Sequence, residues 1–161
     1  MKQIIFVCTG NIFRSMIAEF ALRATPGHQL MASSAGTIAR PQDMHPDLMA
    51  MLAERGMDCS MHQQTKLDAQ VVDSADWLVA MGLDHQDYIR SQFGRHAPLF
   101  NALAYRVEEP VLDLHEALPD WQERPQAVRD YVRAVITHIW EGMPSLVHRV
   151  QTRFSDHRVV C

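Results

Sequence analysis

The chain has 161 residues, of which 47% are apolar and 21% are charged, and its formal net charge at pH 7 is −4. This negative balance excludes the basic surface that nucleic-acid-binding domains usually need. The longest apolar runs are too short to cross a bilayer, so we expect neither nucleic acid nor a membrane as a partner. The length predicts a single domain over residues 1–161, with a partly helical tail from about residue 145.

The N-terminus and the cysteines favour a cytoplasmic protein. One lysine precedes the first apolar run, without the long apolar core or small-residue cleavage site of a signal peptide. Cys8, Cys59 and Cys161 are odd in number and far apart, which makes a poor disulfide framework. Cys59 and His62 have a C-x-x-H spacing without a second pair, so we expect no metal and no cofactor. We expect His62 to hydrogen-bond neighbouring loops and the other histidines to lie at the surface.

Strand and helix patterns alternate along the first hundred residues. The predicted elements are a strand over 3–8, a helix over 15–24, a strand over 28–34, a helix over 46–56, a short helical segment over 68–74, a strand over 76–81, a helix over 83–93 and a short strand over 96–100. This alternation predicts βαβ units. The fold class is therefore α/β: a small doubly wound, four-stranded parallel sheet flanked by helices on both faces.

The last third of the chain divides into two parts. Residues 101–124 have little periodicity and are rich in acidic side chains, of which Glu116 is interpreted as part of a solvated loop. From Pro125 a stripe of apolar residues predicts a long helix, which we expect Gly142 and Pro144 to end or kink.

The loop between the first strand and the first helix has the sequence CTGNIFRS, from Cys8 to Ser15. Parallel sheets bind ligands beyond the carboxyl ends of their strands, where this loop lies. Successive backbone N–H groups of a tight loop, followed by a helix N-terminus, bind anions. Gly10 allows close backbone approach, Asn11 can adopt a left-handed conformation, and the planar guanidinium of Arg14 suits two phosphate oxygens. The loop therefore predicts a site for a tetrahedral oxyanion.

Cys8 would lie beneath this anion. The positive field of the loop favours the thiolate form of a cysteine, and Ser15 can hydrogen-bond that thiolate. A thiolate under a bound phosphate is placed for in-line attack at phosphorus, which would form a phosphocysteine. The predicted catalytic pair is Cys8 and Arg14, and the predicted substrate-binding residues are Thr9, Gly10, Asn11, Ile12, Phe13 and Ser15.

These residues also resemble a known family. VCTGNIFRS is similar to the signature loop C-x-G-N-x-x-R-S of the low-molecular-weight protein tyrosine phosphatases, and Ser34-Ala35-Gly36-Thr37 matches the family's S-A-G-T. The resemblance covers roughly the first 100 residues well and the rest loosely. It implies hydrolysis of phosphotyrosine or aryl phosphate monoesters through a phosphocysteine. The implied substrates are a phosphotyrosine protein or a small aryl phosphate, and bacterial members suggest a tyrosine kinase as a partner.

The family's general acid, an aspartate in an Asp-Pro loop before the last helix, has no direct match here. Asp120 and Asp113 remain as candidates. We favour Asp120 because the start of the last helix at Pro125 is the more reliable reference point for counting back, and because Trp121 could then pack against a phenyl ring of the substrate. The family's substrate pockets correspond here to residues 38–45 and 118–121.

Two other functions stay open on the same scaffold. Arsenate reduction needs further cysteines, typically a close pair after the third strand, and none occurs between Cys59 and Cys161. A non-catalytic phosphate-binding or partner-binding module would explain the missing Asp-Pro motif and Met16, which replaces the family's usual proline. Phe13 replaces a second cysteine that many members carry.

Overall fold

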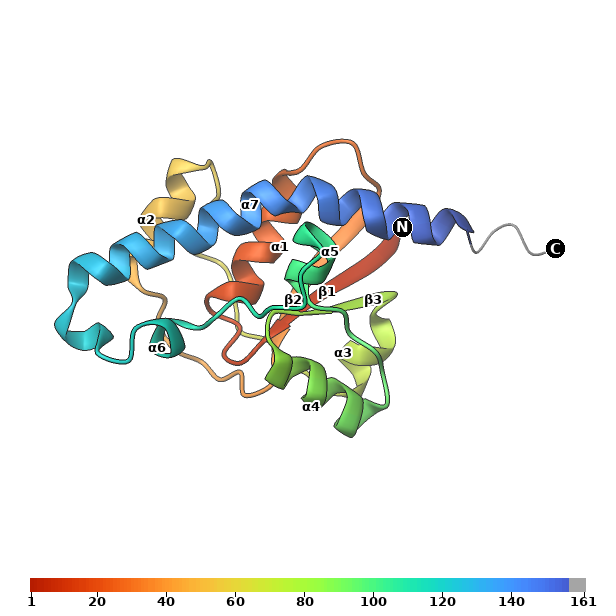
Figure 1. Ribbon diagram of the computed structural model, residues 1–161, viewed down its shortest axis with the longest axis horizontal. Coiled ribbons are helices and arrows are strands. Elements are labelled where there is room, and N and C mark those ends of the chain that lie inside the picture. The colour runs from red at the N-terminus through yellow and green to blue at the C-terminus, as the bar shows by residue number, and fades with distance from the viewer. Residues whose placement is uncertain (157–161) are drawn as a thin grey trace.

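A three-stranded parallel sheet lies at the centre of the molecule, whose computed structural model describes residues 1–156 (Figure 1). The strands are β1 (Lys2–Cys8), β2 (Leu30–Gly36) and β3 (Trp77–Ala80), in the spatial order β2-β1-β3. β1 is thus the central strand. Its carboxyl end, Cys8, pairs in register with Gly36. The α/β fold with a parallel sheet is confirmed.

The predicted fourth strand over residues 96–100 is wrong in extent. The segment contributes one isolated parallel bridge, between Ala80 and Leu99. The N–H of Ala80 donates to the carbonyl of Pro98 at 2.9 Å. Pro98 has no N–H to continue a ladder, and a helix begins at Phe100, so the strand ends after this bridge.

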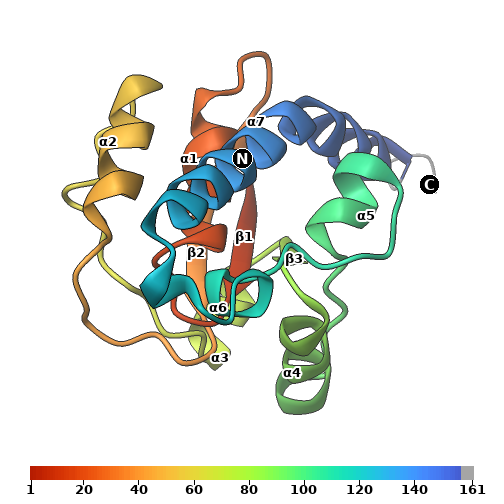
Figure 2. The same ribbon diagram turned by 60° about the vertical axis from the view of Figure 1, so that its left-hand side comes forward.

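Helices cover both faces of the sheet. They are α1 (Arg14–Ala24), α2 (Pro46–Glu54), α3 (Ala69–Ser74), α4 (Leu83–Phe93), α5 (Phe100–Tyr105), α6 (Leu114–Ala117), the 3₁₀ turn η1 (Trp121–Glu123) and α7 (Pro125–Asp156). Side chains of β1 alternate between the two faces, as a strand requires. Ile4 and Phe6 pack with α1, α2, α5 and α7, whereas Ile5 and Val7 pack with α3 and α4. Figure 2 shows the same two layers from another side.

β2 begins and ends two residues later than predicted. His28 does not join the strand, because its Nε2–H donates to the carbonyl of Leu22 at 2.8 Å and its Nδ1 accepts from the N–H of Leu30 at 3.1 Å. The later end brings Gly36 against the loop of residues 8–15. A Cβ on Gly36 would lie 2.5 Å from the carbonyl oxygen of Thr9, so only glycine fits there.

The sequence left open whether Gly142 and Pro144 end or kink the last helix; they do not end it, and the helix runs to Asp156. A proline inside a helix costs about 3 kcal/mol. Five buried apolar residues on both sides of it offset that cost: Ile139, Met143, Leu146, Val147 and Val150. A Cβ on Gly142 would lie 2.8 Å from Ala104, so this glycine lets α5 and α7 pack closely.

Residues 145–156 of the predicted tail are helical, while residues 157–161, with Cys161, lie outside the described part. Between residues 1 and 156, the helices lack the combination of length and apolar character that a bilayer span requires.

Candidate functional site

The loop of residues 8–15 surrounds one hollow at the carboxyl end of β1. The hollow has a volume of about 470 Å³, and its loop lining consists of Cys8, Thr9, Gly10, Ile12, Phe13 and Arg14. Five residues from other segments complete it: Ile38, Arg40, Gln42, Asp113 and His115. We call it the phosphate pocket. The predicted loop residues are thus brought together, except that Asn11 and Ser15 are buried behind the hollow.

Asn11 braces the loop from behind. It is fully buried and adopts a left-handed conformation with φ 55°, which asparagine tolerates better than most residues. Its Oδ1 accepts from the N–H of Thr65 at 2.8 Å. Its carbonyl accepts from Nε2 of His62 at 2.7 Å, which confirms the loop-bracing role expected for His62. The segment of residues 62–65 therefore holds the turn of the loop in place.

Ser15 connects this brace to the thiol. Its Oγ accepts from Nδ2 of Asn11 at 3.0 Å and lies 2.9 Å from Sγ of Cys8. Because Asn11 supplies one hydrogen, the hydroxyl hydrogen of Ser15 is free to point at the sulfur. Cys8 itself is 2% exposed. The buried sulfur of Cys8 thus has a hydroxyl group as its hydrogen-bond partner.

Arg14 is the first residue of α1 and is 3% exposed. Its Nη1 donates to the carbonyl of Val111 at 2.9 Å. Its Nη2 lies 3.4 Å from Oδ2 of Asp113, and its Nη1 lies 3.7 Å from Oε1 of Glu116. The guanidinium is therefore oriented by residues 111–116, which lead into α6 and form its first turn.

Of the two candidate acids, Asp113 lies at the phosphate pocket. Its side chain accepts from the N–H of Leu114 at 2.8 Å at the start of α6, and is 23% exposed. Asp120 is 54% exposed and pairs with Arg124 at 3.5 Å, outside the lining of the pocket. The sequence-based preference for Asp120 thus has no support in the geometry. Residues 114–123 form α6 and η1, and this insertion carries Asp120 away from the loop.

The wall of the phosphate pocket also differs from the expected one. Residues 38–45 contribute Ile38, Arg40 and Gln42, as predicted. The other wall is His115 beside Asp113, not residues 118–121, and the half-buried Trp121 packs against the core.

Glu116 has a role that the sequence reading missed. Its Oε1 accepts from the N–H of Asp113 at 2.9 Å and also faces Arg14. Asp113 and Glu116 form a capping box, in which the Asp113 side chain accepts from the backbone N–H of Glu116 and the Glu116 side chain accepts from the backbone N–H of Asp113. The D-x-x-E spacing was the available signal. One carboxylate thus connects Arg14 to the backbone of Asp113.

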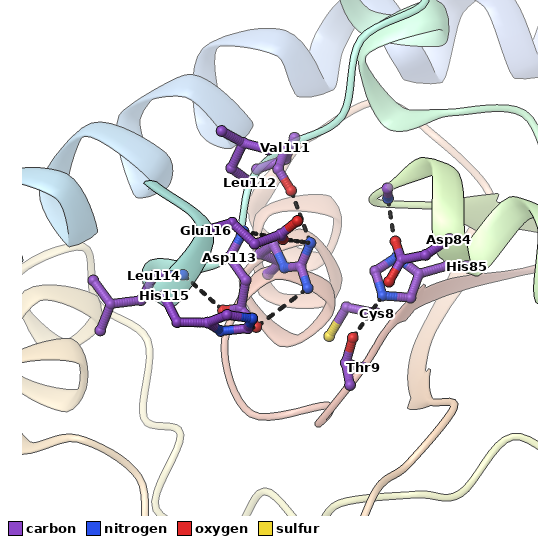
Figure 3. Close-up of polar contacts among 12 residues, drawn as sticks. Cys8, Thr9, Asp84, His85, Val111, Leu112, Asp113, Leu114, His115 and Glu116 are labelled. Carbon is purple, nitrogen blue, oxygen red and sulfur yellow. Dashed lines mark hydrogen bonds and ion pairs between the residues drawn. The ribbon is translucent and has the colours of Figure 1, made fainter. Parts of the chain in front are cut away.

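His85 was expected at the surface, and this is wrong: it is 1% exposed. Its Nδ1 accepts from the N–H of Gly82 at 3.0 Å, so the proton sits on Nε2, which donates to Oγ1 of Thr9 at 2.8 Å. Burial, and then the charge of Arg14, lower the pKa of His85 from 6.5 to about 4. A neutral imidazole therefore orients Thr9 from the side opposite Asp113 (Figure 3).

Within residues 1–156, no group of three or more His, Cys, Asp or Glu side chains is arranged to hold a metal ion.

Residues 3–154 match the family described as low molecular weight phosphotyrosine protein phosphatase. The chain belongs to this phosphatase family. A Ralstonia solanacearum relative named "Probable low molecular weight protein-tyrosine-phosphatase EpsP" is 36% identical over 84 residues, which cover 51% of this chain and 57% of that protein. A Bacillus subtilis relative named "Protein-arginine-phosphatase" is 36% identical over 98 residues, covering 58% of this chain and 65% of that protein. These alignments thus span less than two thirds of either phosphatase.

The fold of the family extends further than these alignments. The crystal structure of a YwlE mutant from Bacillus subtilis superimposes with a TM-score of 0.79 at 26% identity, covering 94% of this chain and 99% of that one. An arsenate reductase from Brevibacillus brevis is also similar, at 29% identity over 135 residues, covering 84% of this chain and 91% of that protein. The phosphatase scaffold is therefore shared by relatives whose names give different substrates.

Proposed function

We propose that this chain hydrolyses phosphotyrosine or aryl phosphate monoesters through a phosphocysteine intermediate. One observation carries the proposal: a thiol, a guanidinium and a carboxyl group, from Cys8, Arg14 and Asp113, line the same hollow. Membership of the phosphatase family supports it. No cofactor enters the mechanism.

In the first step the loop N–H groups and Arg14 bind the phosphate oxygens. The Cys8 thiolate attacks phosphorus in line, the P–O bond to the aryl group breaks, and Asp113 gives its proton to the leaving oxygen. In the second step Asp113, now a carboxylate, takes a proton from water. That water attacks phosphorus, the P–S bond breaks, and the thiolate and inorganic phosphate are released.

The lining of the phosphate pocket supports an aryl ester over a phosphorylated guanidinium. Ile12, Phe13 and Ile38 offer apolar surface, and the planar groups of Arg40 and His115 can stack on a ring. A phosphoarginine side chain brings additional N–H donors that need acceptors; Thr9, Gln42 and Asp113 carry acceptors in the lining, but its apolar wall supplies none. We expect p-nitrophenyl phosphate and phosphotyrosine to be turned over much faster than phosphoarginine.

The arsenate alternative requires a second thiol that can reach Cys8. Within residues 1–156 the other cysteine is Cys59, which is 3% exposed and has its sulfur 3.4 Å from Sδ of Met44. Burial raises the pKa of the Cys59 thiol, which disfavours its thiolate. We therefore expect no arsenate-dependent consumption of a thiol reductant; such consumption would favour the reductase.

A pH–rate profile of aryl phosphate hydrolysis tests the mechanism and assigns the acid. We expect Cys8→Ser and Arg14→Ala to abolish turnover, and Asp113→Asn to lower kcat by about 10²–10⁴ and remove the basic limb. Asp120→Asn is the matched control, and we expect it to keep the wild-type kcat and the basic limb of the profile. Near wild-type turnover by Cys8→Ser would overturn the mechanism. Phosphate binding without turnover in the wild type would favour a non-catalytic module.

The proposal includes a cytoplasmic location, because a nucleophilic cysteine must stay reduced. It also includes a phosphorylated tyrosine kinase as one protein substrate, by resemblance to bacterial members. Mixing Cys8→Ser protein with an autophosphorylated tyrosine kinase tests this. We expect a complex that inorganic phosphate displaces, and no complex with the dephosphorylated kinase.

A further inference from the structure

A second hollow, of about 190 Å³, adjoins the phosphate pocket. Its floor consists of three aliphatic side chains, Leu48 from α2 and Val128 and Val132 from α7, which are 2%, 3% and 4% exposed. Val128 and Val132 are four residues apart and so lie on one face of α7. We call this hollow the side pocket. Its aliphatic floor suits an apolar group and offers a polar group no partner.

The side pocket and the phosphate pocket share a wall. Ile12, Phe13 and Asp113 line both hollows, so a ligand in one lies beside a ligand in the other. Consecutive residues of an extended peptide are about 3.3 Å apart. A peptide whose phosphorylated side chain enters the phosphate pocket therefore carries its neighbouring side chains past the mouth of the side pocket.

We propose that the side pocket binds an apolar side chain close to the phosphorylated residue of a protein substrate. The inference rests on the proposed phosphatase function and adds a sequence preference to it.

The charged residues at the side pocket do not favour a basic occupant. The carboxylate of Asp113 already lies 3.4 Å from Arg14 and 3.5 Å from Nδ1 of His115. Asp43 and His45 are exposed and contribute one acidic and one imidazole group to the lining. An exposed ion pair to Asp43 would contribute little, whereas apolar burial against Leu48, Val128 and Val132 would contribute more.

A scan of phosphotyrosine peptides tests the proposal. In an alanine-based peptide, leucine or lysine replaces one alanine at a time on either side of the phosphotyrosine. We expect leucine to raise kcat/KM about tenfold at one or two positions, and lysine to have no such effect. The same peptides, titrated against Cys8→Ser protein by fluorescence anisotropy, should show a matching fall in Kd.

Variants that fill the side pocket provide the second arm. Val132→Phe, or the milder Val128→Leu if the first does not fold, should reduce the leucine-to-alanine ratio of kcat/KM to about one. Met49→Phe is the matched control, because Met49 lies on α2, is 37% exposed and is not among the residues that line the side pocket. It should leave the ratio unchanged.

Three results would overturn the proposal: a flat leucine scan in the active wild type, a leucine preference that survives filling in a folded variant, or a preference for lysine. Failure to hydrolyse p-nitrophenyl phosphate would instead refute the proposed function. The binding arm still reports on the side pocket in that case, because it needs no turnover.

Discussion

Substitution of Glu116 tests whether one carboxylate positions both Arg14 and Asp113. Glu116→Ala removes the hydrogen bond from the N–H of Asp113, at 2.9 Å, and the pair with Arg14, at 3.7 Å. The hydrogen bond is worth about 0.5–1.5 kcal/mol. The ion pair is worth about 0–1 kcal/mol, because Glu116 is 44% exposed and water screens it. Together these are about 0.5–2.5 kcal/mol, which corresponds to a fall in kcat/KM of roughly 2–70-fold.

The assay compares p-nitrophenyl phosphate with phenyl phosphate. Phenolate is the poorer leaving group, so its departure depends more on protonation by a correctly placed Asp113. We expect Glu116→Ala to lose more activity on phenyl phosphate than on p-nitrophenyl phosphate. Glu116→Gln keeps an acceptor for the N–H of Asp113 and should lose only a few-fold. A merely structural effect would lower the activity on both substrates by the same factor.

Glu108→Ala is the matched control, since Glu108 is an exposed acid in the same segment. The reasoning is refuted if Glu116→Ala retains wild-type kinetics on both substrates, or if Glu108→Ala shows the same loss.

Two further predictions concern residues that support the loop. His85 is protonated more readily when unfolded, where its pKa is near 6.5, than when folded, where its pKa is about 4. The neutral His85 therefore contributes on the order of 3 kcal/mol to the free energy of unfolding above pH 6.5, and this contribution is lost as the pH falls towards 4. Urea unfolding at a series of pH values should show a weaker pH dependence of stability in His85→Gln. Gly36→Ala places a methyl group 2.5 Å from the carbonyl of Thr9, so vanadate affinity should fall at least tenfold. Gly142→Ala is the control: its methyl group would lie 2.8 Å from Ala104, so it should lower the melting temperature and leave vanadate binding unchanged. Unchanged vanadate binding by Gly36→Ala would count against the close packing of β2 on the loop.

The phosphate loop could be predicted from the sequence because its chemistry is local. Cys8, Gly10, Asn11 and Arg14 lie within one turn between a strand and a helix, so their spacing alone implies a common centre. The prediction of a fourth strand was wrong for a local reason too. Pro98 has no N–H to donate to a ladder, and this outweighed the apolar pattern around it.

The choice between the two candidate acids could not be made in this way, because their positions depend on tertiary structure. Counting back from Pro125 favoured Asp120, but α6 and η1 take up the intervening residues and leave Asp113 at the loop. His85 and Glu116 were missed for the same reason. Polar side chains at these positions resemble surface residues until α4 and α6 are packed against the loop.

The brace behind the loop has a consequence for regulation. Asn11 is held by Thr65, His62 and Ser15, all of them protein groups, so the loop takes its shape from the protein and not from a bound ester. In the proposed mechanism such a site would bind inorganic phosphate through the same N–H groups and the same guanidinium that bind the substrate. If the proposed mechanism holds, we expect inorganic phosphate, its product, to compete with the substrate and turnover to fall as the free phosphate concentration rises.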